Sequence, residues 1–255
     1  LLARWKLRKA PAGPFHLMIV FSICTIIWGV LTGVYFGLNN MPGLFTPRVR
    51  WLTDDLHIMA LCIFIGAIHL TVAHAWNMLR FINSMRAIAQ AGWIAITWAI
   101  YFMARSMLLK APMPGFTMAL AVGGLIAVMF FMTPLRMMKS EWANHAMLPL
   151  TLMSNFGDIL SYLRLWALGI AGLQLADAFN RIAGPMFGAG FVWWIIGVLI
   201  LFAGHGLNIV LSALSVLVHG IRLNALEFSM HMGLEWTGFE FKPFRLARGM
   251  RDGTW

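Results

Sequence analysis

The sequence predicts an all-α protein that crosses a membrane several times. Of its 255 residues, 60% are hydrophobic and only 11% are charged, and its mean hydropathy is +0.78. A soluble domain carries about 25% charged residues. Apolar runs of about 20 residues, long enough to cross a bilayer as helices, recur along the chain. These observations exclude a soluble globular domain.

Six apolar runs are long enough to be membrane spans. We expect them at about 15–37, 56–79, 87–109, 115–138, 144–182 and 189–233. The last two are near forty residues each, so these helices must tilt strongly or project from the membrane. Turn-forming residues mark several of the joints: Pro42-Gly43, Pro112, Pro114-Gly115 and Gly184-Pro185.

The spans divide the chain into four expected parts. Residues 1–14 form a basic cytoplasmic start that ends a preceding helix, and 15–138 form a four-helix membrane bundle. Residues 139–234 form two long tilted helices, and 235–255 form a cytoplasmic tail. Because the chain starts without Met and with basic residues, we expect a further N-terminal part to precede it. No signal peptide is evident.

Arginine and lysine predict the orientation, because cytoplasmic loops are enriched in both. With six spans, one side of the membrane receives twelve of them: Arg4, Lys6, Arg8, Lys9, Arg80, Arg86, Arg136, Lys139, Lys242, Arg245, Arg248 and Arg251. The other side receives five: Arg48, Arg50, Arg105, Lys110 and Arg181. Both ends of the chain are therefore expected in the cytoplasm. The net charge of +10 reflects these loops, and no aromatic and basic motif indicates nucleic-acid binding.

Arg164 lies deep in the fifth apolar run. A guanidinium stays charged in proteins, and placing one at mid-membrane costs roughly 2.5–3.5 kcal/mol on insertion scales. Arg222 occupies the last run in the same way. Two intramembrane arginines indicate a protein that handles charge. Cys24 and Cys62 lie in separate apolar runs and are interpreted as small apolar core residues.

The sixth run carries a polar stripe on one helical face. Its members are separated by steps of 3, 4, 3, 4 and 3: His205, Asn208, Ser212, Ser215, His219 and Arg222. A stripe of this length needs either a partner helix or a column of water. We favour an aqueous path, with hydrogen bonding between helices as the alternative. His69 and His74, in the second run, are expected to be packed histidines that bond a neighbouring helix.

In the fifth run, Ser154, Asp158 and Ser161 lead up to Arg164 at steps of 4, 3 and 3. Asp158 is a candidate proton relay or arginine partner, or a carboxylate near the interface that bonds neighbouring hydroxyls. Further along, Gln174 precedes an expected ion pair between residues four apart, Asp177 and Arg181. Glu227 lies about one turn beyond Arg222, where we expect a solvated helix end.

These motifs resemble the membrane subunit a of V-type and A-type rotary ATPases, called subunit I in prokaryotes. The resemblance rests on SYLRLWAL at 161–168, on HGIRLNALEF at 219–228 and on the tail GFEFKPF at 238–244. It implies that this chain holds the last six of eight spans, following a large cytoplasmic domain. It also implies that the two long helices lie against a ring of proteolipid c subunits.

The resemblance assigns roles in ion translocation. Arg164 matches the essential arginine that faces the ring carboxylate, and Arg222 matches a second arginine on the next helix. His219, Glu227 and Gln174 match polar positions near these arginines. The sequence departs from eukaryotic members at Gly172, where they often carry histidine, and at Leu150 and Ser212, where they carry glutamates. Asp158, Ser212, Ser215 and His219 would then share the proton work with water, together with Asn208 and Ser161.

The implied mechanism is electrostatic. A ring carboxylate crosses lipid in its neutral form, and a fixed positive charge nearby favours its ionised form and releases its ion. The chain would thus be a non-catalytic stator subunit in a prokaryotic plasma membrane that conducts H⁺ or Na⁺ through two half-channels. It would need no cofactor or metal. Its implied partners are the c-ring, membrane lipid and, through the preceding domain, a peripheral stalk and the soluble ATPase sector.

Two other functions remain open from the residues. In a membrane cytochrome b, His205 and His219, fourteen apart, would serve as haem ligands, but the second pair that this needs is poor because His57 and His69 are twelve apart. A stand-alone anion transporter would bind its substrate at Arg164. It would predict broken helices and internal repeats, and neither is apparent.

Overall fold

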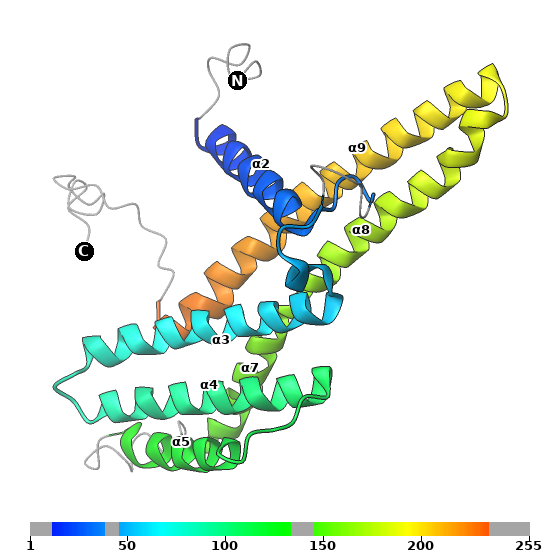
Figure 1. The fold of residues 1–255 in the computed structure, drawn as a ribbon. Helices are drawn as coiled ribbons and strands as arrows, with labels where there is room; N and C mark the ends of the chain where they lie inside the picture. Colours follow the sequence, from blue (N-terminus) through cyan, green and yellow to red (C-terminus); the bar gives the residue numbers. More distant parts are fainter. Residues whose placement is uncertain (1–11, 39–45, 134–144, 235–255) are drawn as a thin grey trace, which may run out of the picture.

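The computed structural model describes residues 12–38, 46–133 and 145–234 (Figure 1). Its elements, in chain order, are α2 (Ala12–Thr32), η1 (Arg50–Thr53), α3 (Asp55–Arg80), α4 (Arg86–Leu109), α5 (Thr117–Phe131), α7 (Leu148–Ser161), α8 (Leu163–Ala183), η3 (Gly184–Gly188), α9 (Phe191–Arg222), η4 (Leu223–Phe228) and α10 (Ser229–Met232). Within these ranges there is no β-strand, only one isolated bridge between Tyr35 and Leu38. The predicted all-α class is confirmed.

Apolar helices of membrane-spanning length confirm an integral membrane protein. In the described ranges five segments are long and apolar enough to cross: Phe15–Thr32, Asp55–Arg80, Arg86–Leu109, Leu148–Gly188 and Phe191–Met232. The expected fourth span, 115–138, is described as the 15-residue α5. The number of six spans therefore stays a prediction. Most of the expected basic start and the whole tail, with its GFEFKPF segment, lie outside the described residues.

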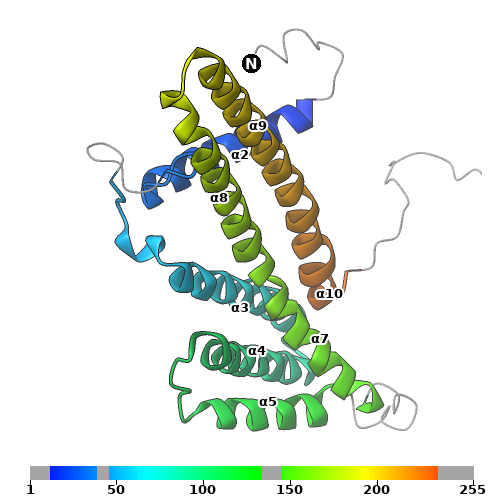
Figure 2. The ribbon, with the colours of Figure 1, turned by 90° about the vertical axis from the view of Figure 1, so that its right-hand side faces the viewer.

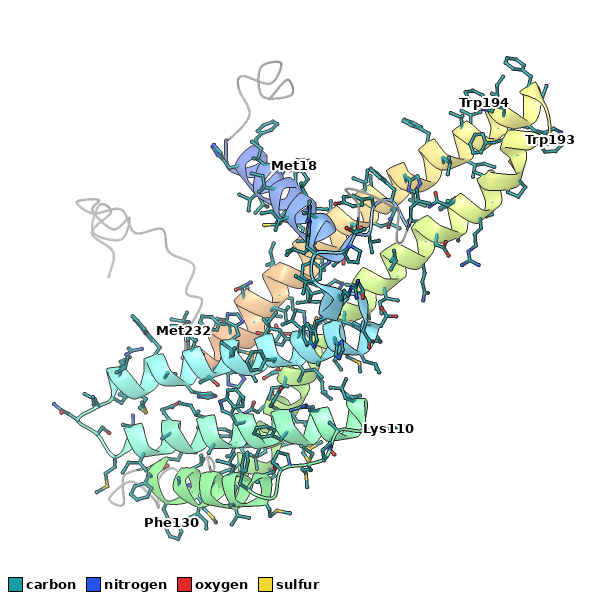
Figure 3. All side chains as sticks on the ribbon, in the orientation of Figure 1. Met18, Lys110, Phe130, Trp193, Trp194 and Met232 are labelled. Carbon is teal, nitrogen blue, oxygen red and sulfur yellow. The ribbon has the colours of Figure 1, made fainter. Side chains whose placement is uncertain are left out.

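The two long helices form an antiparallel hairpin that projects beyond the other helices (Figures 1 and 2). Its first arm, α7, α8 and η3, covers 41 residues, and its second, α9, η4 and α10, covers 42. The regular α-helical hydrogen bonding of the first arm is interrupted at Tyr162, between α7 and α8. There the backbone N–H of Tyr162 donates to the carbonyl of Ile159, three residues earlier, at 3.3 Å. Trp193 and Trp194 lie near the tip (Figure 3), where the chain turns. Such aromatic residues are typical of a membrane–water interface.

Helices α3, α4 and α5 lie side by side and support the base of the hairpin (Figure 2). Their buried contacts include Ile63 and Leu70 from α3, and Ile159 of α7 joins the same cluster. Gly92 and Gly124 let α4 and α5 approach closely. A Cβ on Gly92 would lie 2.8 Å from the Gly124 carbonyl oxygen, and one on Gly124 would lie 2.7 Å from the Gly92 oxygen. Only glycine fits this crossing without movement.

The first helix ends early and attaches to the middle of the hairpin. α2 stops at Thr32, short of the expected end near 37, because Gly33 turns the backbone with φ 69°. Gly37, at φ 78°, then approaches α8 so closely that a Cβ there would lie 2.7 Å from the backbone nitrogen of Asp177. Asn180 Nδ2 donates to the Phe36 carbonyl at 2.7 Å. These contacts fix the segment that follows α2 against α8.

Candidate functional site

The predicted site residues all lie on the hairpin. The first arm carries four of them: Asp158 and Ser161 on α7, and Arg164 and Gln174 on α8. The second arm carries the other six: Asn208, Ser212, Ser215, His219 and Arg222 on α9, and Glu227 on η4. The structure joins some of these residues across the two arms and leaves others exposed.

Arg164 lies in the first turn of α8, two residues after the interruption at Tyr162, and is partly exposed. Its Nη1 lies 3.5 Å from Nδ1 of His219 on the opposite arm, at the upper limit for a hydrogen bond. Within the described ranges no carboxylate forms an ion pair with Arg164. This guanidinium is therefore held loosely by its own chain, and most of its five N–H donors remain available.

The polar stripe of α9 faces α8 along part of its length. His205 Nε2 bonds Asn180 Oδ1 at 3.0 Å, and Asn208 Nδ2 donates to the Gly172 carbonyl at 3.1 Å. Hydrogen bonding between helices thus accounts for these two members. Ser212 is exposed and Ser215 is partly exposed, as expected for residues that border water or a partner, and Gln174 of α8 is exposed too. An aqueous path along the stripe stays a prediction.

Glu227 does not lie at a solvated helix end, and that expectation was wrong. Its side chain is only 5% exposed, and Oε1 accepts from Nε of the half-exposed Arg222 at 3.3 Å. The other oxygen, Oε2, is buried without a hydrogen-bond partner in the described part of the chain. The cause is η4, a π-helical turn that packs against α3 and turns Glu227 inward. Single π-helical turns of this kind are frequent at functional sites.

Asp158 pairs with a residue that the sequence did not single out. Its Oδ2 lies 3.0 Å from Nε2 of His231, on α10. Neither an arginine nor a hydroxyl, the partners considered for Asp158, takes this place. Ser161 Oγ bonds the backbone oxygen of Asp158 at 2.7 Å, not its carboxylate. The spacing of the polar stripe did not predict a role for His231. This residue follows the π-helical turn, which rotates the next residues away from the positions that a regular α-helix would give them.

His69 and His74 of α3 are packed against neighbouring helices, as predicted. His69 Nδ1 lies 2.5 Å from the hydroxyl of buried Tyr162, and its ring stacks on Phe228 with centroids 4.2 Å apart. His74 Nδ1 donates to Gln90 Oε1 of α4 at 2.9 Å. Asp177 and Arg181 form the expected ion pair at 2.8 Å on exposed helix surface.

Comparisons with known proteins identify relatives that match nearly the whole chain. No family model matches the sequence, and no solved structure shows significant similarity. The V-type ATP synthase subunit I of Borreliella burgdorferi is 34% identical over 94% of this chain. The V-type subunit I 1 of Treponema pallidum is 32% identical over 90%, and the A-type subunit I of Pyrococcus abyssi 28% over 97%. The chain is homologous to subunit I of V-type and A-type ATP synthases.

The resemblance in the motifs around Arg164 and Arg222 is thus confirmed by similarity over nearly the whole chain. The chain spans 43%, 39% and 37% of the length of these three subunit I proteins, respectively. The homology therefore covers a subunit I segment that is rich in membrane-spanning helices. In the cytochrome b alternative, His205 and His219 would be haem ligands. In the structure each of them contacts a side chain of α8 instead: His205 bonds Asn180, and His219 lies against Arg164.

Proposed function

We propose that this chain is the membrane stator part of a V/A-type rotary ATPase, which conducts H⁺ or Na⁺ between two half-channels and the carboxylates of a proteolipid ring. It is non-catalytic, lies in a prokaryotic plasma membrane with both ends cytoplasmic, and assembles with the ring, a peripheral stalk and the ATPase sector. The observation that carries the proposal is Arg164, a permanent charge on an apolar hairpin that pairs with no carboxylate within the described residues.

The hairpin surface fits a partner that supplies the missing carboxylate. Its apolar side chains are largely uncovered, among them Leu207, Leu211, Leu214 and Val218 on α9. A cation at mid-membrane persists where it has a function or a partner. A passing ring carboxylate would ionise close to Arg164 and release its ion, because an opposite charge within a few ångströms stabilises the charged form. The fixed charge also repels cations and so separates the two half-channels.

The polar residues on either side of Arg164 are the proposed routes for the ion. Asp158 and Ser161 lie on one side along the first arm, and Gln174 lies on the other. From the second arm, His219 reaches Arg164, while Ser212 and Ser215 border the exposed face. Each elementary charge moved across 100 mV is worth about 2.3 kcal/mol, so several ions per ATP can couple the membrane part to hydrolysis or synthesis.

The test is a substitution at Arg164 in the assembled complex, reconstituted into liposomes. Arg164→Ala should abolish ATP-driven ion uptake while the complex still assembles with its ring, and Arg164→Lys should restore little, because lysine lacks the planar guanidinium fork. Arg181→Ala is the matched control, since Arg181 is exposed and its ion pair in the described part of the chain is with Asp177. Normal uptake by Arg164→Ala refutes the proposal. Anion transport by the isolated chain, without any ring, would favour the stand-alone transporter instead.

A further inference from the structure

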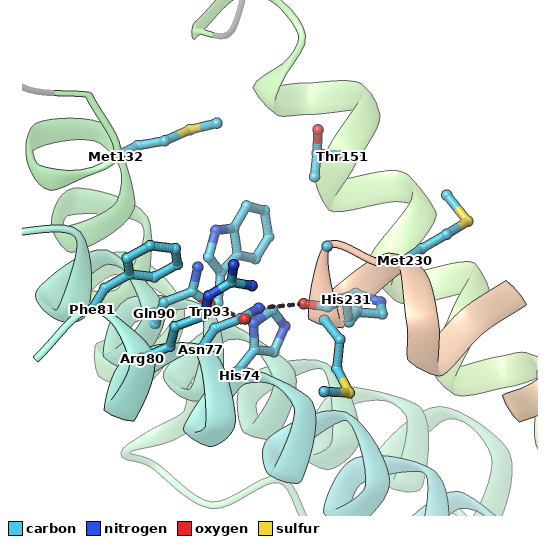
Figure 4. A pocket seen from close by; sticks show the side chains of 12 residues that line it. His74, Asn77, Arg80, Phe81, Gln90, Trp93, Met132, Thr151, Met230 and His231 are labelled. Carbon is cyan, nitrogen blue, oxygen red and sulfur yellow. Dashed lines mark hydrogen bonds between the residues drawn. The ribbon is translucent and has the colours of Figure 1, made fainter. Parts of the chain in front are cut away.

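A pocket of about 350 Å³ opens between the ends of α3, α4, α7 and α10 (Figure 4). Its polar lining consists of His74, Asn77, Arg80, Gln90, Thr151 and His231. The pocket lies at the Arg80 end of α3, the side that the arginines and lysines predict to be cytoplasmic. It has room for several water molecules, since each occupies about 30 Å³ in the liquid.

His74 lines this pocket, and one of its two ring nitrogens has no hydrogen-bond partner among the described residues. The residue is 4% exposed, and its Nδ1 bonds Gln90 Oε1 at 2.9 Å. Because an amide oxygen only accepts, Nδ1 carries the proton of the neutral ring and Nε2 carries a lone pair. That Nε2 is buried and has no hydrogen-bond partner in the described ranges. A buried acceptor without a partner is costly, and water in the pocket would satisfy it.

His231 stands between this pocket and Asp158. Its ring centroid lies 5.0 Å from that of His74, and it lines the same pocket. Asn77 Nδ2 holds its backbone carbonyl at 2.7 Å, the bond drawn in Figure 4. On its other side, Nε2 of the ring donates to Asp158 Oδ2 at 3.0 Å. Asp158 in turn precedes Arg164 by six residues, about 9 Å along a helix.

We infer that the pocket is a water-filled entrance in which His231 passes protons between cytoplasmic water and Asp158, while His74 holds pocket water next to His231. The inference rests on the proposed function and deepens it by naming the ion as H⁺ and this pocket as its cytoplasmic entrance. None of the sequence motifs pointed to His231, to the pocket or to a role of His74 in transport.

The transfer conserves protons at each step. A hydronium ion in the pocket gives its proton to Nδ1 of His231, which becomes an imidazolium. The Nε2 proton of this ring then passes to the Asp158 carboxylate, so that one proton has moved from water to Asp158. Tautomer exchange through the pocket water returns the proton of the neutral ring from Nδ1 to Nε2. Proton release to the cytoplasm follows the same steps in reverse.

The charges around the two rings favour the excess proton on His231. Asp158 from α7 touches His231 and stabilises its imidazolium, whereas Arg80 from α3 lines the pocket and repels positive charge. From α4 the lining receives only the uncharged Gln90 and Trp93. His74, with its free Nε2, is then the acceptor that keeps a chain of hydrogen-bonded water next to His231.

The test uses the full-length subunit in the assembled complex, with ATP-driven proton uptake into liposomes measured by a pH-sensitive dye. Glutamine at position 231 can still donate a hydrogen bond to Asp158 but cannot relay a proton. We therefore expect His231→Gln to lower uptake at least about tenfold, since a positioned proton-transfer group typically contributes 10²–10⁴-fold. His74→Gln should lower uptake by a smaller factor, and added imidazole should partly restore His231→Gln.

His57→Gln is the control, because His57 lies partly exposed at the far end of α3 and, among the described residues, its side chain bonds Trp51 and Asp54. Wild-type uptake by His231→Gln and His74→Gln, with Arg164→Ala still inactive, overturns this inference and leaves the proposed function standing. If Arg164→Ala also pumps normally, the proposed function itself has failed. Transport of Na⁺ without protons, or an experimental map with a phospholipid filling the pocket, would overturn this inference as well.

Discussion

Nη1 of Arg164 lies 3.5 Å from Nδ1 of His219, across the interface between α8 and α9. This contact can form only while Nδ1 of His219 is unprotonated, since a guanidinium has donors and no acceptor. His219 therefore orients the guanidinium without neutralising its charge. A carboxylate in the same place would have formed an ion pair and removed Arg164 from use by an outside partner.

The His219 contact predicts a partial effect on transport. His219→Ala should lower ATP-driven ion uptake by no more than about tenfold, because a hydrogen bond this long contributes at most about 1.4 kcal/mol of positioning. Uptake into liposomes, compared with Arg164→Ala in the same complex, measures it. His205→Ala serves as control, because it removes a bond between the two arms far from Arg164. A loss as complete as that of Arg164→Ala would instead make His219 a carrier of the ion.

The pair of Arg222 and Glu227 predicts a stability effect that a second substitution repairs. Arg222→Ala leaves the buried Glu227 carboxylate with neither oxygen paired, which should cost about 1–3 kcal/mol. Glu227→Gln in the same chain removes the charge and should recover most of that loss. Thermal unfolding of the detergent-solubilised subunit measures both variants. Equal melting temperatures for wild type and Arg222→Ala would show that the pair contributes nothing.

Ion uptake should depend less on Arg222 than on Arg164, although the loss of Arg222 lowers the stability of the fold. Arg222→Ala is expected to reduce ion uptake less than Arg164→Ala, because Arg222 already has a carboxylate partner in its own chain. An unchanged rate of uptake by Arg222→Ala would show that Arg222 contributes to the packing of the fold and not to transport.

Two adjacent glycines of α5 offer a matched test of helix packing. Gly124→Val should destabilise the fold by about 1–3 kcal/mol, since its Cβ would lie 2.7 Å from the Gly92 carbonyl oxygen on α4. Gly123→Val should have little effect, because no described residue outside the local turns of α5 has an atom within 4 Å of its Cβ position. Both changes add the same side chain to the same helix. Equal melting temperatures for the two variants would contradict the close approach of α4 and α5.

Much of the fold follows from apolar length alone. Runs of about forty residues predicted the two arms, which the structure gives as Leu148–Gly188 and Phe191–Met232. Regular 3- and 4-residue steps placed His205, Asn208 and His219 on one face of a helix, and in the structure all three contact α8. The pair of Asp177 and Arg181 followed from their spacing of four. Each of these predictions depends only on the geometry of a regular α-helix.

Side-chain spacing does not predict the structure where the backbone leaves that geometry. The π-helical turn at η4 inserts Glu227 into the interior and brings His231 to Asp158, and no α-helical spacing shows this. Gly33 ends α2 early because it adopts a positive φ, which the apolar run around it does not reveal. The pocket beside His74 joins the neighbouring helices α3 and α4 to α7 and α10, which are distant from them in sequence, so only the folded chain could show it.

The docking of Gly37 and Phe36 on α8 has a mechanical consequence. Under the proposed function, a ring that turns against the hairpin would push it sideways, and a hairpin fixed only at its base would bend under that push. The bond from Asn180 to Phe36 and the close approach of Gly37 to Asp177 lie well up the first arm. In the proposed rotary complex these contacts would pass part of the sideways force to α2, so that the arm would be supported midway along its length and would resist bending.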